Sequence, residues 1–304
     1  MNQKSAHQLR IEIRPIRTLD ELRQCIDVQI SAWGMNPEDV TPLHVLKALI
    51  DNGGIVLGAF DENGRVVGFC WGFFAVSENG TIEYFYSHET GVREEFKNRG
   101  VGYLLKLAQR AYVLRRGVKL IKWTFDPAQS LNAYFNFAKL GVIAREFYEN
   151  YYGELRDRIN RAMPTDRFRV EWWLQSKRVI DRIERGVPPP SLSRVSSKLG
   201  EDLDVVLDVR ITEKGFVAPS EPVLSSTKPY LLVAIPRSIS ELRDRDPDLA
   251  LCWRLAIRKV MKHYVVAKKY TVCEYLYDKG SEYGYYLLTS IPVDKILEGE
   301  VPWS

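Results

Sequence analysis

A glycine-rich turn between a strand and a helix constrains this chain more than any other feature. The stretch FKNRGVGYLLKLAQRA (96–111) follows a strand-forming run, 81–92, and becomes a periodic amphipathic pattern directly after Gly102. Glycine in a helix costs roughly 0.5–1 kcal/mol relative to alanine, so Gly100 and Gly102 need a reason. The first N–H groups of a helix attract anions, and glycine lets a ligand approach them. The stretch therefore predicts a phosphate-binding turn, although neither GxGxxG nor the P-loop pattern occurs.

Strands and helices alternate around this turn. Periodicity predicts the order β α α β β β α β α β β to about residue 176, with a capping box at Thr18 and Glu21 and a hairpin at Asn63-Gly64. After the glycine turn we expect a helix with four polar residues on its outer face, Lys106, Gln109, Arg110 and Arg115. A strand at 118–126 and a helix at 127–140 follow. The predicted fold class is α/β (α+β) with a mixed, mostly antiparallel sheet.

The second half of the chain reads as a smaller α/β domain, 201–304, behind a linker at 177–200 that is rich in proline and serine. Asp246-Pro247 is expected to begin a long helix there. Its apolar stripe needs a sheet to pack on, and the strands predicted nearby are few. We therefore expect these strands to join or abut the first domain, 9–176. An independent domain tethered by 185–200 is the alternative.

Composition excludes several functional classes. A net charge of +4 over 304 residues is too small to indicate nucleic-acid binding. The longest apolar run, VVGFCWGFFAV, is about half a membrane span, and the first ten residues have no apolar signal core. Four separated cysteines without CxxC spacing indicate reduced, mostly buried thiols and a cytoplasmic location. The four histidines lack metal-ligand spacing, so we expect no metal. A homodimer is compatible with the sequence.

The glycine turn resembles the acetyl-CoA signature of the GNAT superfamily of N-acetyltransferases, R/Q-x-x-G-x-G/A. Lys97 stands at the first position, which is a departure, and Gly100 and Gly102 stand at the glycines. NAYFNFAKLGV resembles a later helix of that superfamily, and the element order is similar over 9–176. Four further stretches, SHETGV, TFDP, YG and DRF, together with DPDLALCWRLAIRKV, resemble an uncharacterised two-domain branch of predicted GNAT acetyltransferases.

The resemblance implies acetyl-CoA as cofactor and direct attack of an amine on its thioester. It places the pantetheine and the oxyanion on backbone N–H groups within Thr90, Gly91 and Val92. It places the pyrophosphate on the amides of Arg99, Gly100, Val101, Gly102 and Tyr103, with Lys97 and Arg99 as available cations. Asn98 and Asn132 complete the expected cofactor contacts.

Amine acetylation needs a base for the ammonium and an acid for the leaving thiolate. Alternation counted back from Val92 puts Thr90, His88, Tyr86 and Tyr84 on one face of the strand, so His88 is the first candidate base. Glu83 and Glu89 have the opposite parity, unless a bulge near Gly91 reverses it, and stay alternatives. A structural, hydrogen-bonded His88 is also open.

The acid and the acceptor site are less constrained. Phe137 stands where the superfamily often has a tyrosine, and Tyr134, one turn earlier, is the candidate acid. Core packing of Tyr134, with the proton coming from water, is the alternative. Asp126 either binds the amine or caps the helix at Pro127. The acceptor side is expected to include Tyr152, Glu154, Asp166 and Arg167, for which solvated-loop roles are equally open.

The leading function is N-acetyltransfer to a small-molecule or amino-acid-like amine acceptor. One alternative is a non-catalytic acyl-CoA-binding sensor or scaffold, which the Phe137 departure favours. The other is a protein lysine acetyltransferase.

Overall fold

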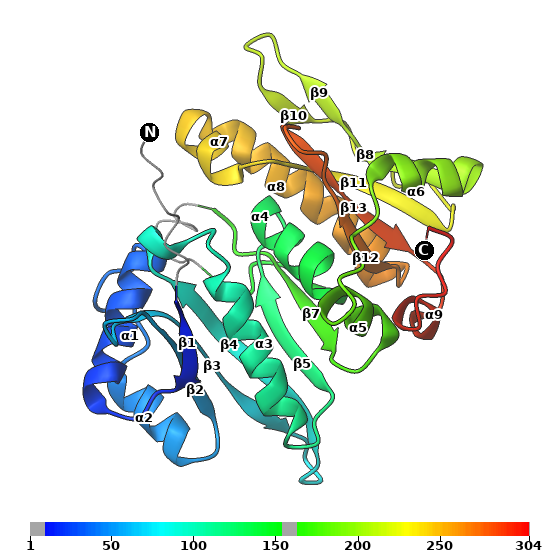
Figure 1. Ribbon diagram of the computed structural model, residues 1–304. Helices are drawn as coiled ribbons and strands as arrows, with labels where there is room; N and C mark the ends of the chain where they lie inside the picture. The colour runs from blue at the N-terminus through cyan, green and yellow to red at the C-terminus, as the bar shows by residue number, and fades with distance from the viewer. Residues whose placement is uncertain (1–9, 154–162, 304) are drawn as a thin grey trace, which may run out of the picture. The chain divides into compact units, whose positions relative to one another are not determined.

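The computed structural model describes residues 10–153 and 163–303 (Figure 1). The described chain divides into two compact units, one ending at Ile121 and the other beginning at Lys122. This division falls inside the segment 9–176 that the sequence suggested as one domain. The three-part division at 176 and 200 stays a prediction.

Four strands form the sheet of the first unit, in the order β1-β2-β3-β4 and antiparallel throughout. They are β1 (Glu12–Pro15), β2 (Ile55–Phe60), β3 (Val66–Val76) and β4 (Ile82–Val92). The predicted hairpin joins β2 to β3. In its turn the Gly64 N–H donates to the Asp61 carbonyl at 3.0 Å, and Gly64 has a φ of +75°, a left-handed conformation that glycine adopts without steric cost.

The helices of this unit are α1 (Leu19–Trp33), α2 (Leu43–Asp51), the short 3₁₀ turn η1 (Glu94–Phe96) and α3 (Val101–Leu114). The predicted capping box is present: Thr18 Oγ1 accepts from the Glu21 N–H at 3.2 Å, and the Glu21 carboxylate accepts from the Thr18 N–H at 3.1 Å. Side chains alternate along β3, so that Phe69 and Trp71 pack in the core under α1 and α2. Cys70 points the other way, toward the Leu105 carbonyl of α3.

In the second unit the strand order is β5-β7-β6-β12-β13-β11-β8. The strands are β5 (Leu120–Phe125, from Lys122 on in this unit), β6 (Ile143–Tyr148), β7 (Arg167–Trp173), β8 (Leu203–Leu207), β11 (Tyr230–Pro236), β12 (Thr271–Leu276) and β13 (Tyr283–Thr289). β8 runs parallel to β11, and the pairs from β7 to β11 are antiparallel. The predicted mixed, mostly antiparallel sheet is thus confirmed. β9 (Val209–Ile211) and β10 (Val217–Pro219) form a separate ribbon.

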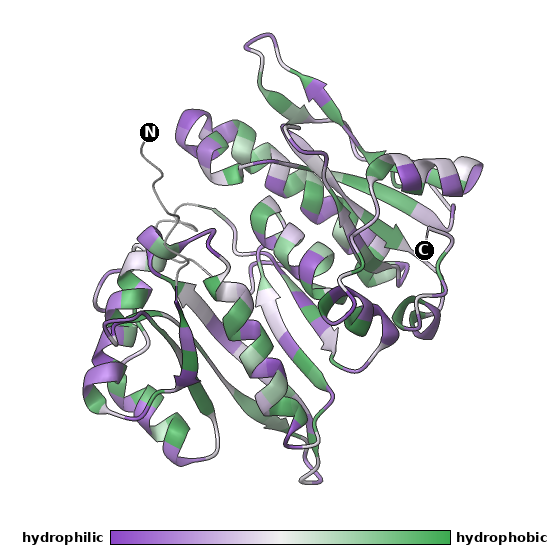
Figure 2. Ribbon diagram, in the orientation of Figure 1, coloured by the Kyte–Doolittle hydropathy of each residue, from purple (hydrophilic) through white to green (hydrophobic). Residues whose placement is uncertain are grey.

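C-terminal strands continue a sheet that begins much earlier in the chain, as expected. Val272 of β12 pairs with Ala144 of β6. Figure 2 shows the strands as largely hydrophobic, and buried aromatic side chains such as Trp172 and Tyr286 fill the core beside them. A free, tethered C-terminal domain does not describe this arrangement.

The helices of the second unit depart from the expectation in two places. The helix expected at 127–140 begins only at Ser130, as α4 (Ser130–Ala133), and widens into a π-helix, η2 (Tyr134–Leu140). The expected linker contains α5 (Lys177–Ile183) and α6 (Leu192–Leu199). Arg178 of α5 is buried and donates to the Glu274 carboxylate of β12 at 2.7 Å, so tertiary contacts order a segment whose own periodicity is weak.

The remaining elements are η3 (Gly200–Asp202), α7 (Ile239–Arg245), α8 (Pro247–Met261), the π-helix η4 (Lys262–Ala267) and α9 (Val293–Leu297). The predicted start of α8 is confirmed, since Asp246 Oδ1 accepts from the Leu249 N–H at 3.0 Å. The apolar stripe expected on α8 was Leu249, Cys252, Trp253, Ala256 and Val260. The last three are buried, whereas Ala250 and Ile257 are buried in place of Leu249 and Cys252, and Cys252 is exposed. Across the described ranges, no helix is long and apolar enough to cross a membrane.

Candidate functional site

The glycine turn lies where the sequence predicts it, between β4 and α3. Asn98 and Gly100 have φ values of +60° and +85°, so the chain turns through two left-handed residues before the helix. Within the described ranges no side chain caps α3. A Cβ on Gly100 would meet no described atom within 4 Å, and one on Gly102 would meet only Val92 at 3.8 Å. Packing within this unit therefore does not account for a glycine at position 102.

Three contacts to α1 hold the start of this turn. Arg93 lies 3.5 Å from the Asp27 carboxylate, and the Glu94 N–H donates to Ser31 Oγ at 3.1 Å. The Lys97 ammonium donates to the Ala32 carbonyl at 2.9 Å and pairs with Glu94 at 2.6 Å. Lys97, expected as a phosphate cation, is thus engaged as an anchor of the turn.

Arg99 is the exposed cation of the turn itself. Its guanidinium lies 5.9 Å from the Phe96 ring centroid, and its side chain is exposed. Val101 is buried and Tyr103 is half-buried at the start of α3. The backbone amides from Arg99 to Tyr103 therefore stand at an uncapped helix start beside a positive side chain, which is the electrostatic environment that an anion needs.

A β-bulge at His88 changes the parity that the sequence suggested for β4. Trp71 pairs with Glu89 and Gly72 pairs with Ser87, so His88 is the extra residue. The bulge puts His88 and Glu89 on one face of β4, and Thr90 and Val92 on the other. The expectation that His88 shares a face with Thr90 and Val92 was wrong, because strict alternation does not survive a bulge.

Gly72 makes the bulge possible. A Cβ at this position would lie 2.2 Å from the Tyr86 carbonyl oxygen and 2.5 Å from the Phe85 ring. Both atoms belong to β4, so any larger residue would push the two strands apart where His88 bulges.

His88 has the protonation state of a base. Its ring centroid lies 4.5 Å from that of Trp71, and its Nε2 lies 4.0 Å from Glu89 Oε1. Burial lowers the pKa of His88, and the neighbouring Glu89 carboxylate opposes that change without reversing it. The imidazole is therefore neutral near pH 7 and able to accept a proton, while 32% of its side chain remains exposed.

Glu89 is fixed by two donors that sequence reasoning missed. Trp71 Nε1 donates to Glu89 Oε2 at 2.8 Å, and Thr41 Oγ1 donates to Oε1 at 3.1 Å. Because Thr41 lies 48 residues away in the chain, no local pattern could have indicated it. Glu83 is exposed and five residues from His88, or about 16 Å along the strand, so it does not converge with them.

The expected oxyanion segment is the end of β4. Thr90, Gly91 and Val92 pair with Cys70, Phe69 and Gly68 of β3. A Cβ on Gly91 would lie 3.0 Å from the Trp33 ring, so glycine permits α1 to pack closely at this point.

A buried lysine lies behind β4, on the face opposite His88. Lys106 of α3 donates to Ser87 Oγ and to Gln109 Oε1, both at 3.0 Å, and is 3% exposed. Burial lowers its pKa from 10.5 to about 7. The expectation that Lys106 and Gln109 lie on the solvated face of α3 was wrong, because Ser87 supplies a polar partner inside the unit.

The other predicted residues belong to the second unit. Tyr134 is half-buried on η2, with the Lys139 ammonium 5.9 Å from its ring centroid, and Asn132 is exposed on α4. Phe137 is fully buried. Glu154 lies outside the described residues.

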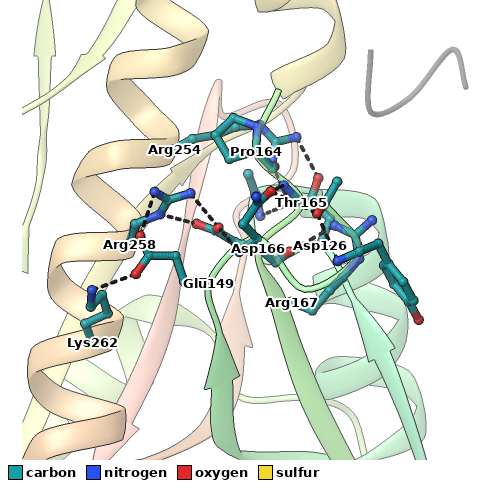
Figure 3. Close-up of polar contacts among 12 residues, drawn as sticks. Asp126, Glu149, Pro164, Thr165, Asp166, Arg167, Arg254, Arg258 and Lys262 are labelled. Carbon is teal, nitrogen blue, oxygen red and sulfur yellow. Dashed lines mark hydrogen bonds and ion pairs between the residues drawn. The ribbon is translucent and has the colours of Figure 1, made fainter. Parts of the chain in front are cut away.

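Asp126 and Asp166 are ion-pair partners of α8 (Figure 3). Arg254 donates to both carboxylate oxygens of Asp126, at 3.2 and 2.7 Å, and to the Pro164 carbonyl at 3.2 Å. Arg258 donates to both oxygens of Asp166, at 2.9 and 2.7 Å. Asp126 also accepts from the Ala128 N–H at 2.9 Å, which caps a turn and not the helix, since α4 begins at Ser130.

Glu149 extends this set of ion pairs, with Arg258 at 3.0 Å and Lys262 at 2.6 Å (Figure 3). Tyr152 and Arg167 stand beside it: the Tyr152 hydroxyl lies 3.0 Å from Thr124 Oγ1, and the Arg167 guanidinium lies 5.4 Å from the Tyr152 ring centroid. The ion pairs with Arg254 and Arg258 give Asp126 and Asp166 a structural role in this unit.

Within the ranges that the structure describes, no cluster of three His, Cys, Asp or Glu side chains could hold a metal ion. No family model and no curated protein matches the sequence.

Comparison with solved structures found GNAT acetyltransferases among its matches. A GNAT family acetyltransferase from Streptococcus pneumoniae is 11% identical, with a TM-score of 0.43, over 53% of this chain and 98% of that one. An aminoglycoside 6'-acetyltransferase type Ii is 16% identical, with a TM-score of 0.42, over 54% and 97%. A GNAT family acetyltransferase from Brucella melitensis in complex with acetyl-CoA is 17% identical, with a TM-score of 0.35, over 42% and 81%.

Proposed function

We propose that this chain is an acetyl-CoA-dependent N-acetyltransferase that acts on an amine. The observation that carries the proposal is the glycine turn: two left-handed residues lead into an uncapped α3, directly after the strand that carries His88 and Glu89. The resemblance of Lys97, Gly100 and Gly102 to the acetyl-CoA signature supports the same function.

The residues present fit the cofactor. The amides of Arg99 to Tyr103 would hold the pyrophosphate, the Arg99 guanidinium would balance its charge, and Gly102 would let it approach the backbone. When bound, acetyl-CoA would supply a thioester carbon for the amine nitrogen and a thiolate leaving group, which would receive through water the second proton that the nitrogen loses.

His88 would hold the proton that the acceptor loses. An ammonium has no lone pair, so it must give up a proton before its nitrogen can attack, and the neutral imidazole of His88 can take it. Glu89 would stabilise the resulting imidazolium, because its carboxylate is fixed 4.0 Å from Nε2 by Trp71 and Thr41.

A charge substitution at Gly102 tests the proposal. Gly102→Glu puts an anion in the first turn of α3, where it favours the helix but repels a pyrophosphate, and Gly102→Gln has the same shape without the charge. We expect the Glu variant to bind acetyl-CoA more than about tenfold more weakly than the Gln variant in calorimetry. Its melting temperature should be no lower. Equal affinities, or a wild-type protein that does not bind acetyl-CoA, would contradict the proposal.

The buried Phe137 favours a second candidate, an acyl-CoA-binding sensor without turnover, since phenylalanine cannot protonate a leaving thiolate. Release of free thiol from acetyl-CoA in the presence of pooled amines separates the two. A sensor binds the cofactor and releases none.

A further inference from the structure

Four aromatic rings form a continuous row on one face of the β3–β4 ribbon. Ring centroids of Trp71 and Phe73 on β3 lie 6.4 Å apart, and those of Tyr86 and His88 on β4 lie 6.0 Å apart. Cross-strand contacts of 4.5 Å (Trp71 to His88) and 5.6 Å (Phe73 to Tyr86) close the set. We call these four residues the aromatic face.

The aromatic face continues the core face of β3 into solvent. Phe69 is fully buried under α1 and α2, whereas Phe73, four residues further on the same side of the strand, is 40% exposed. The side chain of His88 keeps 32% of its surface exposed, and Tyr86 is half-buried. Cross-strand aromatic pairs stabilise a sheet whether they are buried or exposed. Sheet stability therefore does not explain why these rings face water, whereas ligand binding would.

A carboxylate borders one end of this row. Glu89 is on the same face because of the bulge at His88, and its side chain is 15% exposed. Each of its oxygens has one donor, from Trp71 and Thr41, and a carboxylate can accept about four hydrogen bonds. Negative charge beside electron-rich ring faces attracts an ammonium group, whereas it disfavours an anionic or a purely polar ligand.

We propose that the acceptor is an arylalkylamine, a primary amine joined by a short tether to an aromatic ring. The ring packs on Phe73 and Tyr86, and the ammonium lies at His88 and Glu89. The 6.0 Å between the Tyr86 and His88 centroids is close to the distance from the ring centre to the nitrogen in an amine with a two-carbon tether. The inference rests on the proposed function: the ammonium gives one proton to His88, its nitrogen bonds to the acetyl carbon as the C–S bond electrons leave with the thiolate, and the second proton that the nitrogen loses reaches the thiolate through water.

Paired amines and a single truncation test the inference. Acetylation of 2-phenylethylamine should exceed that of 2-methoxyethylamine, which has the same tether without a ring, by about tenfold in kcat/KM. Phe73→Ala should reduce this preference about three- to tenfold and leave the KM for acetyl-CoA unchanged. Val76→Ala is the matched control, since Val76 is an exposed residue of the same strand outside the aromatic face.

Binding of the amine alone separates this inference from the proposed function. Calorimetry of 2-phenylethylamine without acetyl-CoA should show binding that Phe73→Ala weakens by the same factor. Equal use of both amines, or binding that Phe73→Ala leaves unchanged, overturns the inference even where acetyl-CoA is turned over. Absence of acetyl-CoA binding contradicts the proposed function, and the amine titration still decides the acceptor class.

Discussion

At the scale of single residues, the bulged His88 is the group on which the proposed chemistry depends. That this residue is a candidate base was predictable from sequence, because histidine titrates near neutrality. Its surroundings were not: Trp71 reaches it from the neighbouring strand, the bulge turns the adjacent Glu89 to the same face, and Thr41 fixes Glu89 from another part of the chain. Strict alternation predicts that His88 shares a face of the strand with Thr90, whereas the bulge makes it share a face with Glu89.

His88→Gln should lower kcat for amine acetylation by about 10²–10⁴-fold and leave the affinity for acetyl-CoA unchanged. A base works when deprotonated, so wild-type kcat/KM should rise with pH through the pKa of His88. Burial lowers that pKa, which places the midpoint of the rise below the ordinary value of 6.5. The variant should lose this limb of the profile.

His44→Gln provides the control, because His44 is an exposed histidine on α2 of the same unit. An unchanged pH profile in His88→Gln would make His88 a structural group, and Glu89 would become the next candidate base.

At the scale of elements, local signals decided what could be predicted. The capping box of α1, the Asn63-Gly64 hairpin and the Asp246 cap of α8 depend on residues adjacent in sequence, and all three are present. The bulge in β4 depends on Gly72 of the neighbouring strand, and the helix α5 depends on Glu274 of β12, far along the chain. Local sequence periodicity does not indicate such contacts.

Helix α3 illustrates the same limit and makes a measurable prediction. The unfolded chain keeps Lys106 protonated up to its ordinary pKa of 10.5, whereas the folded pKa is about 7. The unfolded state binds the extra proton between these values, so the free energy of unfolding rises with pH across that window. Between pH 7 and 9 the rise from this group is about 2 kcal/mol.

Urea unfolding of Lys106→Met at both pH values should lack this rise, while Lys119→Met, an exposed lysine of the same unit, should keep it. Comparing variants at the same pH also removes the contribution of the buried thiol of Cys70, whose pKa burial raises to about 12. An identical pH dependence in wild type and Lys106→Met would mean that Lys106 is charged when folded.

At the scale of the whole molecule, the ion pairs of α8 tie the second unit together across long stretches of chain. Arg254 and Asp126 are 4% and 5% exposed, so removing one leaves a buried charge without its partner. Arg254→Met should lower the free energy of unfolding by about 3–5 kcal/mol in urea titrations. Arg237→Met, which breaks the exposed pair with Glu282, should cost less than about 1 kcal/mol.

Adding Asp126→Asn to Arg254→Met should recover part of the loss, since the amide carries no charge to bury. A cost for Arg254→Met no larger than that for Arg237→Met would show that the pair does not hold the unit together.

The separation of these partners along the chain also determines how long parts of the second unit stay unpaired during synthesis. Asp126 and Arg254 are 128 residues apart, and Ala144 of β6 awaits Val272 of β12 over a similar stretch. A ribosome adds about 5–20 residues per second, so the edge of β6 stays unpaired for roughly 6 to 25 seconds after it emerges. Unpaired strand edges are templates for aggregation. In a nascent chain the edge of β6 is therefore open to such pairing until β12 has been made.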